Sequence, residues 1–240
     1  MAMPTIVGVG AGTSNVGAMT IPYPVGYTAV LNDIALSFIE TESAGVVTPP
    51  TNWAVLTSST VASGTTTKLW VLWRRLTASE ATPSIADAGD HMGGRMIVLN
   101  GVETVGNPWD VFSSTTELVA DATVSIPSVT TTVADCLILD AFGTGQDVAS
   151  TAGATGWTNI NLGSVTERMD NWVTTGLGGG FAMATGTKAT AGSTGITTAT
   201  LSLTVNFKTL IKIAIKGATA APSASDFPAW KRRQSGLLFR

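Results

Sequence analysis

The stretch DAGDHMGG at residues 87–94 gathers the side chains best suited to acid–base or metal chemistry. It holds Asp87, Asp90 and His91, the only histidine of the chain. A carboxylate beside an imidazole can bind a metal ion or act as a general base. A zinc site needs at least three protein ligands, and no second histidine or cysteine stands at a useful spacing. We therefore expect a turn with a solvated His91 and no metal site.

Three other functional patterns are incomplete or missing. GVGAGTSNVG resembles a dinucleotide-binding loop at Gly8 and Gly10, but Thr13 stands where the third glycine is needed, and Pro22 and Pro24 disfavour the helix that should follow. No G-x-S-x-G elbow presents a serine nucleophile, and the many carboxylates form no distinctive pair of the glycosidase type. We predict a protein that is not an enzyme, with no catalytic residues and no cofactor.

The C-terminal residues FPAWKRRQSGLLFR differ from the rest of the chain in charge and apolar content. As a free tail they would expose large apolar side chains, whereas an extended arm that docks on a neighbouring chain would bury them. Adjacent cations would orient such an arm on an acidic partner. We predict a partner-binding arm made of Phe227, Trp230, Lys231, Arg232, Arg233, Leu237, Leu238, Phe239 and Arg240.

Seven tryptophans offer a second kind of binding surface, because sugar faces pack on aromatic rings. Trp53 and Trp157 hold matching places in the two halves of the chain, which suggests core anchors. Trp109 and Trp172 fall in loops or at strand ends and are the candidates for a ligand surface. A core or protein-interface role is nevertheless the preferred interpretation, since tryptophan is also enriched at protein contacts.

Composition limits the partners. Charged residues make up 12% of the 240 residues and the net charge is −3, against roughly 25% charged residues in an average domain. Nucleic-acid binding depends on phosphate neutralisation by Lys and Arg, so we expect none. The apolar stretches are too short for a membrane helix, the start lacks the features of a signal peptide, and the single Cys136 is expected in the core.

Strand patterns dominate the chain, and helical periodicity is absent. Trp70 and Trp73 lie three positions apart in one such pattern, so they should point to opposite faces, with at most one in a core. Many patterns alternate apolar and polar residues, as half-buried sandwich strands do. We predict strands at 33–41, 52–60, 67–76, 94–102, 120–128, 135–143, 179–187, 199–207 and 209–217.

A faint repeat divides the chain into two halves. Asp33 and Asp135 begin similar apolar strands, and Trp53 and Trp157 follow at similar spacing. One half could not bury its apolar face alone, so the halves should interlock around one core. We predict one β-sandwich domain over 1–217, followed by an Ala/Pro/Ser linker and the arm over 218–240.

The order DIALSFIET, PPTNWAV, TKLWVLWRRL and IPSVTTT resembles a group of tailed-bacteriophage virion proteins with a jelly-roll-like β-sandwich. The resemblance covers roughly residues 26–217, although Ile126 replaces a threonine that is usual in the last motif. It implies a head decoration (cement) protein or a fibre-type domain, and no catalytic residue.

These observations predict an all-β protein, a single two-sheet antiparallel sandwich of jelly-roll-like type with an extended C-terminal arm. We expect a capsid decoration protein that is made in the host cytoplasm, resides in the virion and docks on the major capsid protein through its arm. Its partners would be virion proteins and further copies of itself, with a trimer favoured, and neither nucleic acid nor membrane. The alternative is a tail or fibre protein that binds host glycans through Trp109 or Trp172.

Overall fold

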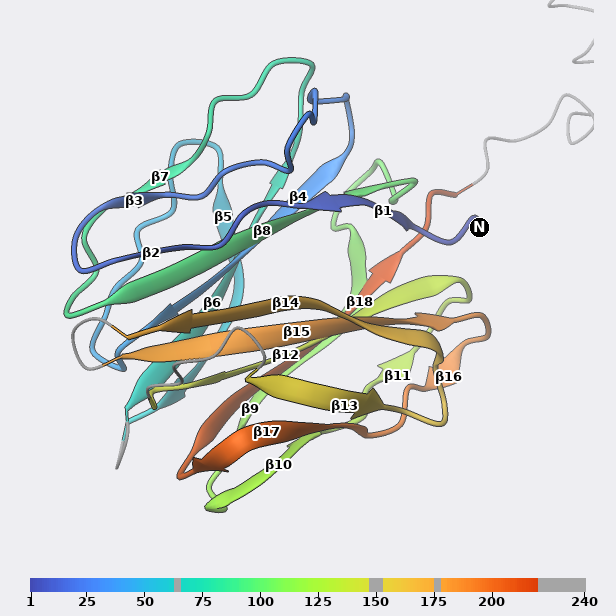
Figure 1. The fold of residues 1–240 in the computed structure, drawn as a ribbon. Helices are drawn as coiled ribbons and strands as arrows, with labels where there is room; N and C mark the ends of the chain where they lie inside the picture. Colours follow the sequence, from blue (N-terminus) through green and yellow to red (C-terminus); the bar gives the residue numbers. More distant parts are fainter. Residues whose placement is uncertain (63–65, 147–152, 175–177, 220–240) are drawn as a thin grey trace, which may run out of the picture.

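A computed structural model describes residues 1–62, 66–146, 153–174 and 178–219. All regular elements in these ranges are strands, in agreement with the predicted all-β class. Two large antiparallel sheets pack face to face, and smaller sheets lie outside them (Figure 1). No described segment forms a helix that is long and apolar enough to span a membrane.

The first large sheet comes entirely from the first half of the chain. Its strands follow the order β1-β8-β4-β6-β5, and β2 also pairs with β8. These strands are β1 (Thr5–Val9), β2 (Thr13–Asn15), β4 (Ile34–Thr41), β5 (Ala54–Val61), β6 (Thr67–Arg75) and β8 (Met92–Asn100).

The second large sheet comes entirely from residues 109–216, after the last strand of the first sheet, and repeats this arrangement. Its order is β14-β15-β12-β18-β9, so β12 is central as β4 is in the first sheet. The sheets exchange no strand, and the predicted two-half organisation is confirmed. The strands are β9 (Trp109–Glu117), β12 (Cys136–Thr144), β14 (Gly163–Val173), β15 (Gly179–Lys188) and β18 (Lys208–Lys216).

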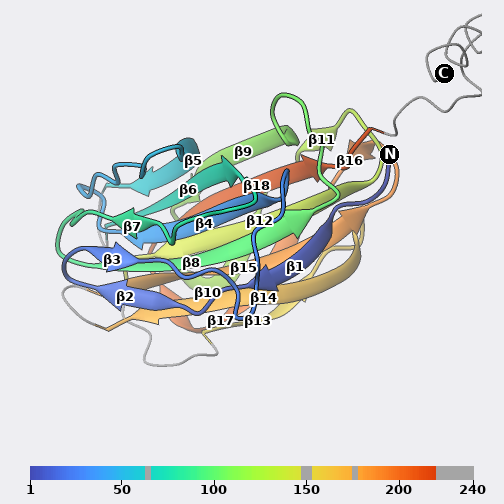
Figure 2. The ribbon, with the colours of Figure 1, turned by 90° about the horizontal axis from the view of Figure 1, so that it is seen from above.

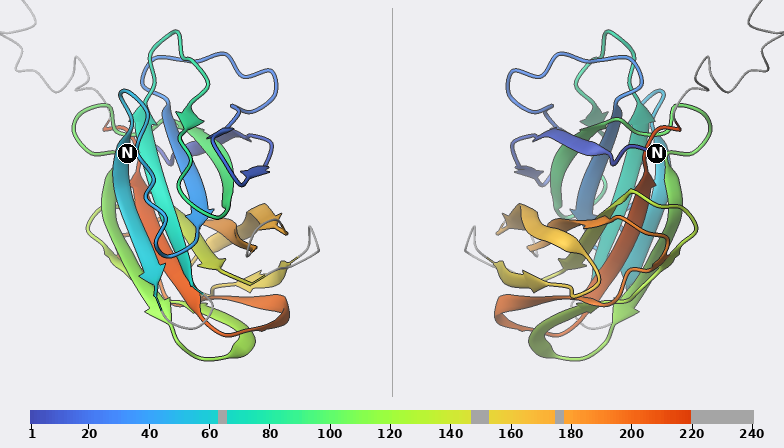
Figure 3. Two further views of the ribbon diagram at one scale, coloured as in Figure 1. Left: turned by 90° about the vertical axis from the view of Figure 1, so that its left-hand side faces the viewer. Right: turned by 90° about the vertical axis from the view of Figure 1, so that its right-hand side faces the viewer.

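The main core lies between the two large sheets (Figures 2 and 3). Alternate residues of each strand point inward, because strand side chains alternate between the two faces. Phe38 of β4 and Phe181 of β15 stack across the interface with ring centroids 6.3 Å apart. Both halves therefore depend on one shared core, as the sequence predicted.

Both outer faces of the sandwich are covered as well. The N-terminal segment with β3 (Met19–Thr20) and β7 (Ser84–Ile85) covers the first sheet. The second sheet is covered by a three-stranded sheet and a two-stranded sheet. Their strands are β10 (Asp121–Ile126), β11 (Thr130–Thr131), β13 (Ala154–Thr158), β16 (Gly192–Ser193) and β17 (Thr197–Val205).

This covering corrects the prediction for Trp70 and Trp73. They do point to opposite faces of β6, but both pack on hydrophobic clusters, Trp70 on the outer one and Trp73 on the main core. Trp53 and Trp157 also anchor the outer clusters, one on each sheet. For the same reason β4 and β12 are buried along their whole length, where half-buried strands were expected.

Candidate functional site

The end of the described chain is held against the body of the sandwich. Gly217 forms an isolated bridge with Val102, and the backbone N–H and the Oγ1 hydroxyl of Thr219 both donate to the carboxylate of Glu103. The hydrogen bond from the Thr219 hydroxyl, followed by those from the backbone N–H groups of Val105, Thr104 and Thr219, lowers the pKa of Glu103 to about 2. The carboxylate of Glu103 therefore stays ionised and accepts both hydrogen bonds from Thr219. These bonds fix the position of Thr219 on the sandwich.

This exit lies beside the N-terminus at one end of the sandwich (Figures 1 and 3). The predicted arm residues, from Phe227 to Arg240, lie outside the described residues. The structure describes the chain as far as Thr219, and the linker and arm over 218–240 stay a prediction.

The two candidate ligand tryptophans lie on opposite edge strands of the second sheet. Trp109 of β9 is half-buried and meets Trp73 edge-on, with ring centroids 5.1 Å apart. Trp172 of β14 packs against Phe142, with ring centroids 6.3 Å apart, and its indole N–H donates to Asp170. The two rings do not form one common platform.

The prediction of a solvated His91 is wrong. The side chain is 1% exposed and lies between two carboxylates, with Nε2 3.1 Å from Oε2 of Glu40 and Nδ1 3.4 Å from Oδ2 of Asp90. Glu40 ends the inward-facing set of β4 and is itself fully buried. Thr67 of β6 donates its hydroxyl to Oε1 of Glu40 at 2.7 Å.

This first-half cluster is not arranged for nucleophilic catalysis. In a serine-type triad the imidazole stands between the hydroxyl and the carboxylate, whereas here Glu40 stands between the hydroxyl of Thr67 and the imidazole of His91. Burial raises the pKa of Glu40, and His91 and Thr67 oppose the rise. Burial lowers the pKa of His91, but the hydrogen bonds and charges of Glu40 and Asp90 together raise it. The cluster therefore lacks the order of groups that a serine-type triad requires.

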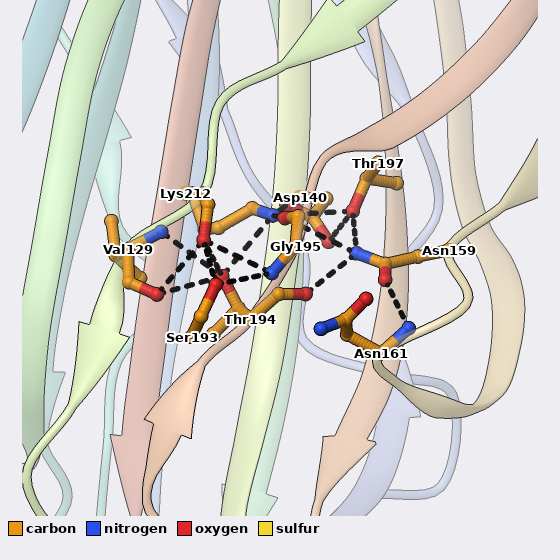
Figure 4. A network of polar contacts seen from close by, with 10 residues as sticks. Val129, Asp140, Asn159, Asn161, Ser193, Thr194, Gly195, Thr197 and Lys212 are labelled. Atoms are coloured by element: carbon orange, nitrogen blue, oxygen red, sulfur yellow. Dashed lines mark hydrogen bonds and ion pairs between the residues drawn. The ribbon is translucent and has the colours of Figure 1, made fainter.

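A second buried polar network lies on the outer face of the second sheet (Figure 4). Asp140 of β12 and Lys212 of β18 are each 1% exposed, and Nζ lies 3.2 Å from Oδ1. Thr197 donates its hydroxyl to Oδ2 of Asp140 at 2.8 Å. Burial raises the pKa of Asp140 and lowers that of Lys212, and each partner's charge opposes the other's shift.

The covering turn is tied into the same network. Lys212 donates to the carbonyl of Gly195 at 2.7 Å, and the amide of Asn159 donates to the carbonyl of Thr194 at 2.9 Å and to Thr197 at 2.8 Å. This network is not among the sites predicted from the sequence. The available signal was a charged residue in the middle of each of two apolar strands, CLILDAF and LIKIAIK.

Metal-ligand clusters, a surface cavity and the single cysteine are the remaining features of the described residues that bear on chemistry. No cluster of three or more His, Cys, Asp or Glu side chains that could hold a metal ion occurs among the described residues. A surface cavity of about 550 Å³ is lined by the loop of Pro50–Trp53 and by residues 79–84. Its charged groups, Arg74 and Glu80, already pair with one another at 2.7 Å. Cys136 is buried as predicted, and burial raises the pKa of its thiol to about 11.

Comparison with known proteins gives no relative to guide the assignment. No protein-family model, no curated protein and no solved structure matches the chain.

Proposed function

We propose that the chain is a non-catalytic structural protein of a bacteriophage virion, a decoration protein that docks on the capsid through residues 220–240. The observation that supports this most directly is the pair of hydrogen bonds to Glu103 from Thr219, which lies next to the predicted arm in sequence. Glu103 and Thr219 hold the end of the described sandwich, and in the sequence an Ala/Pro/Ser stretch and then the basic and aromatic residues follow it. An arm with a defined origin loses less freedom on docking than one with a loose origin.

The composition of the arm fits such a contact. Trp230 and Phe239 can fill pockets of a partner, while Lys231, Arg232 and Arg233 can orient the arm on an acidic surface. When many copies bind at positions related by capsid symmetry, their weak individual contacts add up to strong overall binding. We extend the proposal to a symmetric oligomer, with a trimer favoured.

The body of the protein suits a scaffold rather than a reactive protein. Its described buried ionic groups, exemplified by Glu40 with His91 and Asp140 with Lys212, are engaged with each other inside the fold. The surface also carries exposed apolar side chains, of which Val25 is 98% exposed and Leu31 64% exposed. These residues offer further contact area for neighbouring subunits.

Co-sedimentation with undecorated heads of the phage that encodes the chain tests the proposal. We would compare the full chain, a truncation after Thr219, and the charge-reversed variant K231E/R232E/R233E. The proposal expects the full chain to pellet in symmetry-related copy number, the truncation to stay in the supernatant and the variant to bind weakly. Equal pelleting of all three would assign the contact to the sandwich and overturn the role of the arm.

Failure of all three to pellet would overturn the decoration role itself. The glycan-binding alternative would then be tested on a glycan array, with W109A and W172A as matched variants at the two edges of the second sheet. Binding that only one variant abolishes would locate the ligand surface.

A further inference from the structure

The Asp140–Lys212 pair has an unusual local arrangement. The two residues lie directly opposite one another on neighbouring antiparallel strands, and both side chains point under the turn at residues 194–197. Oδ1 of Asp140 accepts no aligned hydrogen bond from the described residues, although Nζ lies 3.2 Å away. The amine and the carboxyl group are thus in close contact without a well-formed hydrogen bond at this oxygen.

The hydroxyl of Thr197 contacts both the carboxylate of Asp140 and the amine of Lys212. Its Oγ1 donates to Oδ2 of Asp140 at 2.8 Å and accepts from Nζ of Lys212 at 3.3 Å. The amide of Asn159 holds this hydroxyl at 2.8 Å, and the carbonyl of Gly195 holds the amine at 2.7 Å. The hydroxyl therefore provides a path for a proton from the ammonium to the carboxylate (Figure 4).

We propose that Lys212 and Asp140 join in an intramolecular amide bond. The ammonium passes one proton to Oγ1 of Thr197, which passes its own proton to Oδ2 of Asp140 and leaves a neutral amine beside a carboxylic acid. The lone pair of Nζ attacks Cγ, so that a C–N bond forms and the bond from Cγ to Oδ2 breaks. That oxygen leaves as water with its proton and one further proton from the nitrogen, and no oxidant or reductant is needed.

The site favours this condensation for two physical reasons. Reacting groups held in contact by a fold have effective concentrations of about 10⁵–10⁸ M when well oriented. Burial also shifts both pKa values towards the neutral forms, since it raises the pKa of Asp140 and lowers that of Lys212. Water has little access to reverse the reaction, because both side chains are 1% exposed.

The bond would join β18, the last strand before the exit at Thr219, to β12 at the centre of the sheet. Tension on the C-terminal end would then reach the central strand through a covalent link. The inference is independent of the proposed function, because its test involves no partner.

The test is the intact mass of the denatured full-length chain. We expect a mass lower than the sequence mass by one water, and a branched peptide after trypsin that joins the segments around Asp140 and Lys212. The K212R variant is expected at its full sequence mass, which also calibrates any processing at the N-terminus. D140N is expected to release ammonia and so reach the same final mass as the cross-linked wild type.

A Thr197→Val variant tests the proton path. We expect its freshly made chain to carry less of the bond than wild type and to gain it more slowly. A wild-type chain at full sequence mass that trypsin cuts after Lys212 would overturn the proposal, and this result does not depend on whether any variant folds.

Discussion

The two halves of the molecule share one strand order but bury their central carboxylates on opposite faces. Glu40, on the central strand β4, points into the core between the sheets, whereas Asp140, on the central strand β12, points under the outer layer. Their partners also differ, since Glu40 meets His91 and Asp140 meets Lys212. Either face can hold such a pair because the central strands β4 and β12 are buried on both faces.

The two pairs differ in the pH at which their basic group can lose its proton. An imidazole has an ordinary pKa of 6.5 and can lose its proton near neutral pH. An amine has an ordinary pKa of 10.5 and stays charged unless burial forces it to neutralise. The first-half pair should therefore respond to pH, and the second-half pair should respond mainly to loss of a partner.

The largest effect should come from removing one partner of the second pair. Asp140→Ala leaves the buried Lys212 uncompensated, and we expect a loss of about 3–5 kcal/mol in the free energy of unfolding. Chemical denaturation measures this loss. Glu40→Gln should cost less, roughly 1–3 kcal/mol, because the amide can still bond to Thr67 and His91 can become neutral.

The double variant D140L/K212M is the matched control for this prediction. Replacing both partners by apolar residues leaves no buried charge, so the part of the loss that comes from uncompensated charge should return, whereas the stability supplied by the proposed amide bond stays lost. If the double variant is as unstable as Asp140→Ala, loss of the amide bond or of packing, rather than uncompensated charge, explains the loss. Equal losses for Asp140→Ala and Glu40→Gln would remove the difference between the halves.

A smaller effect is expected where the halves touch at Glu40. Gly179 of β15 has φ +146°, and an added Cβ would lie 2.7 Å from Oε2 of Glu40. Gly179→Ala should therefore cost about 1–3 kcal/mol, since it combines backbone strain with a clash on a buried carboxylate. Gly156→Ala, at φ +63° with its nearest neighbour 3.6 Å away, should cost less. Thermal unfolding compares the stability losses of the two variants. A larger loss for Gly179→Ala would show that the clash with Glu40 costs stability in addition to the backbone strain, and equal losses would show that it does not.

The strands of the central sheets could be predicted because apolar periodicity is strong there. All nine predicted strands exist, but β9 and β14 were missed. β9 reads WDVFSSTTE and is an edge strand with few apolar side chains. β14 carries irregularities between Gly163 and Thr166 and between Glu167 and Met169, which break the period of two.

The buried pairs could not be predicted because their partners are distant in the chain. Glu40 lies near the end of an apolar strand, and nothing in the sequence shows that His91 directly precedes the neighbouring strand β8. The repeat was visible because Asp33 and Asp135 each precede a central strand. Of the small outer sheets, the sequence predicted β10 and β17, through the strands at 120–128 and 199–207. It did not predict β3, β7, β11, β13 and β16, which have at most five residues each.

The pH response of the first pair gives the next prediction. The folded-state pKa of His91 is raised, so its contribution is fully present below the unfolded value of 6.5 and is lost as pH rises through the folded value. Glu40, whose pKa is also raised, acts in the same direction. Stability should fall above pH 6.5 by at most about 1.4 kcal/mol per pH unit for one proton. His91→Gln should flatten this slope in denaturation curves taken at several pH values, and an unchanged slope would contradict the assignment.

The smallest effect is expected from Asp170 in the second half, in a different pH window. Burial raises its pKa from 3.8 to about 6, against the opposing hydrogen bond from Trp172. Its contribution is present below pH 3.8 and is lost as pH rises to about 6, so Asp170→Asn should flatten the stability profile only in that acid range. The effect should stay below that of His91, because Asp170 is half-buried and solvent screens it. Trp172 fluorescence should titrate over the same range in wild type and not in Asp170→Asn. If Asp170→Asn instead changed the slope above pH 6.5, the two halves would be coupled through the shared core and could not be treated as separate titrating units.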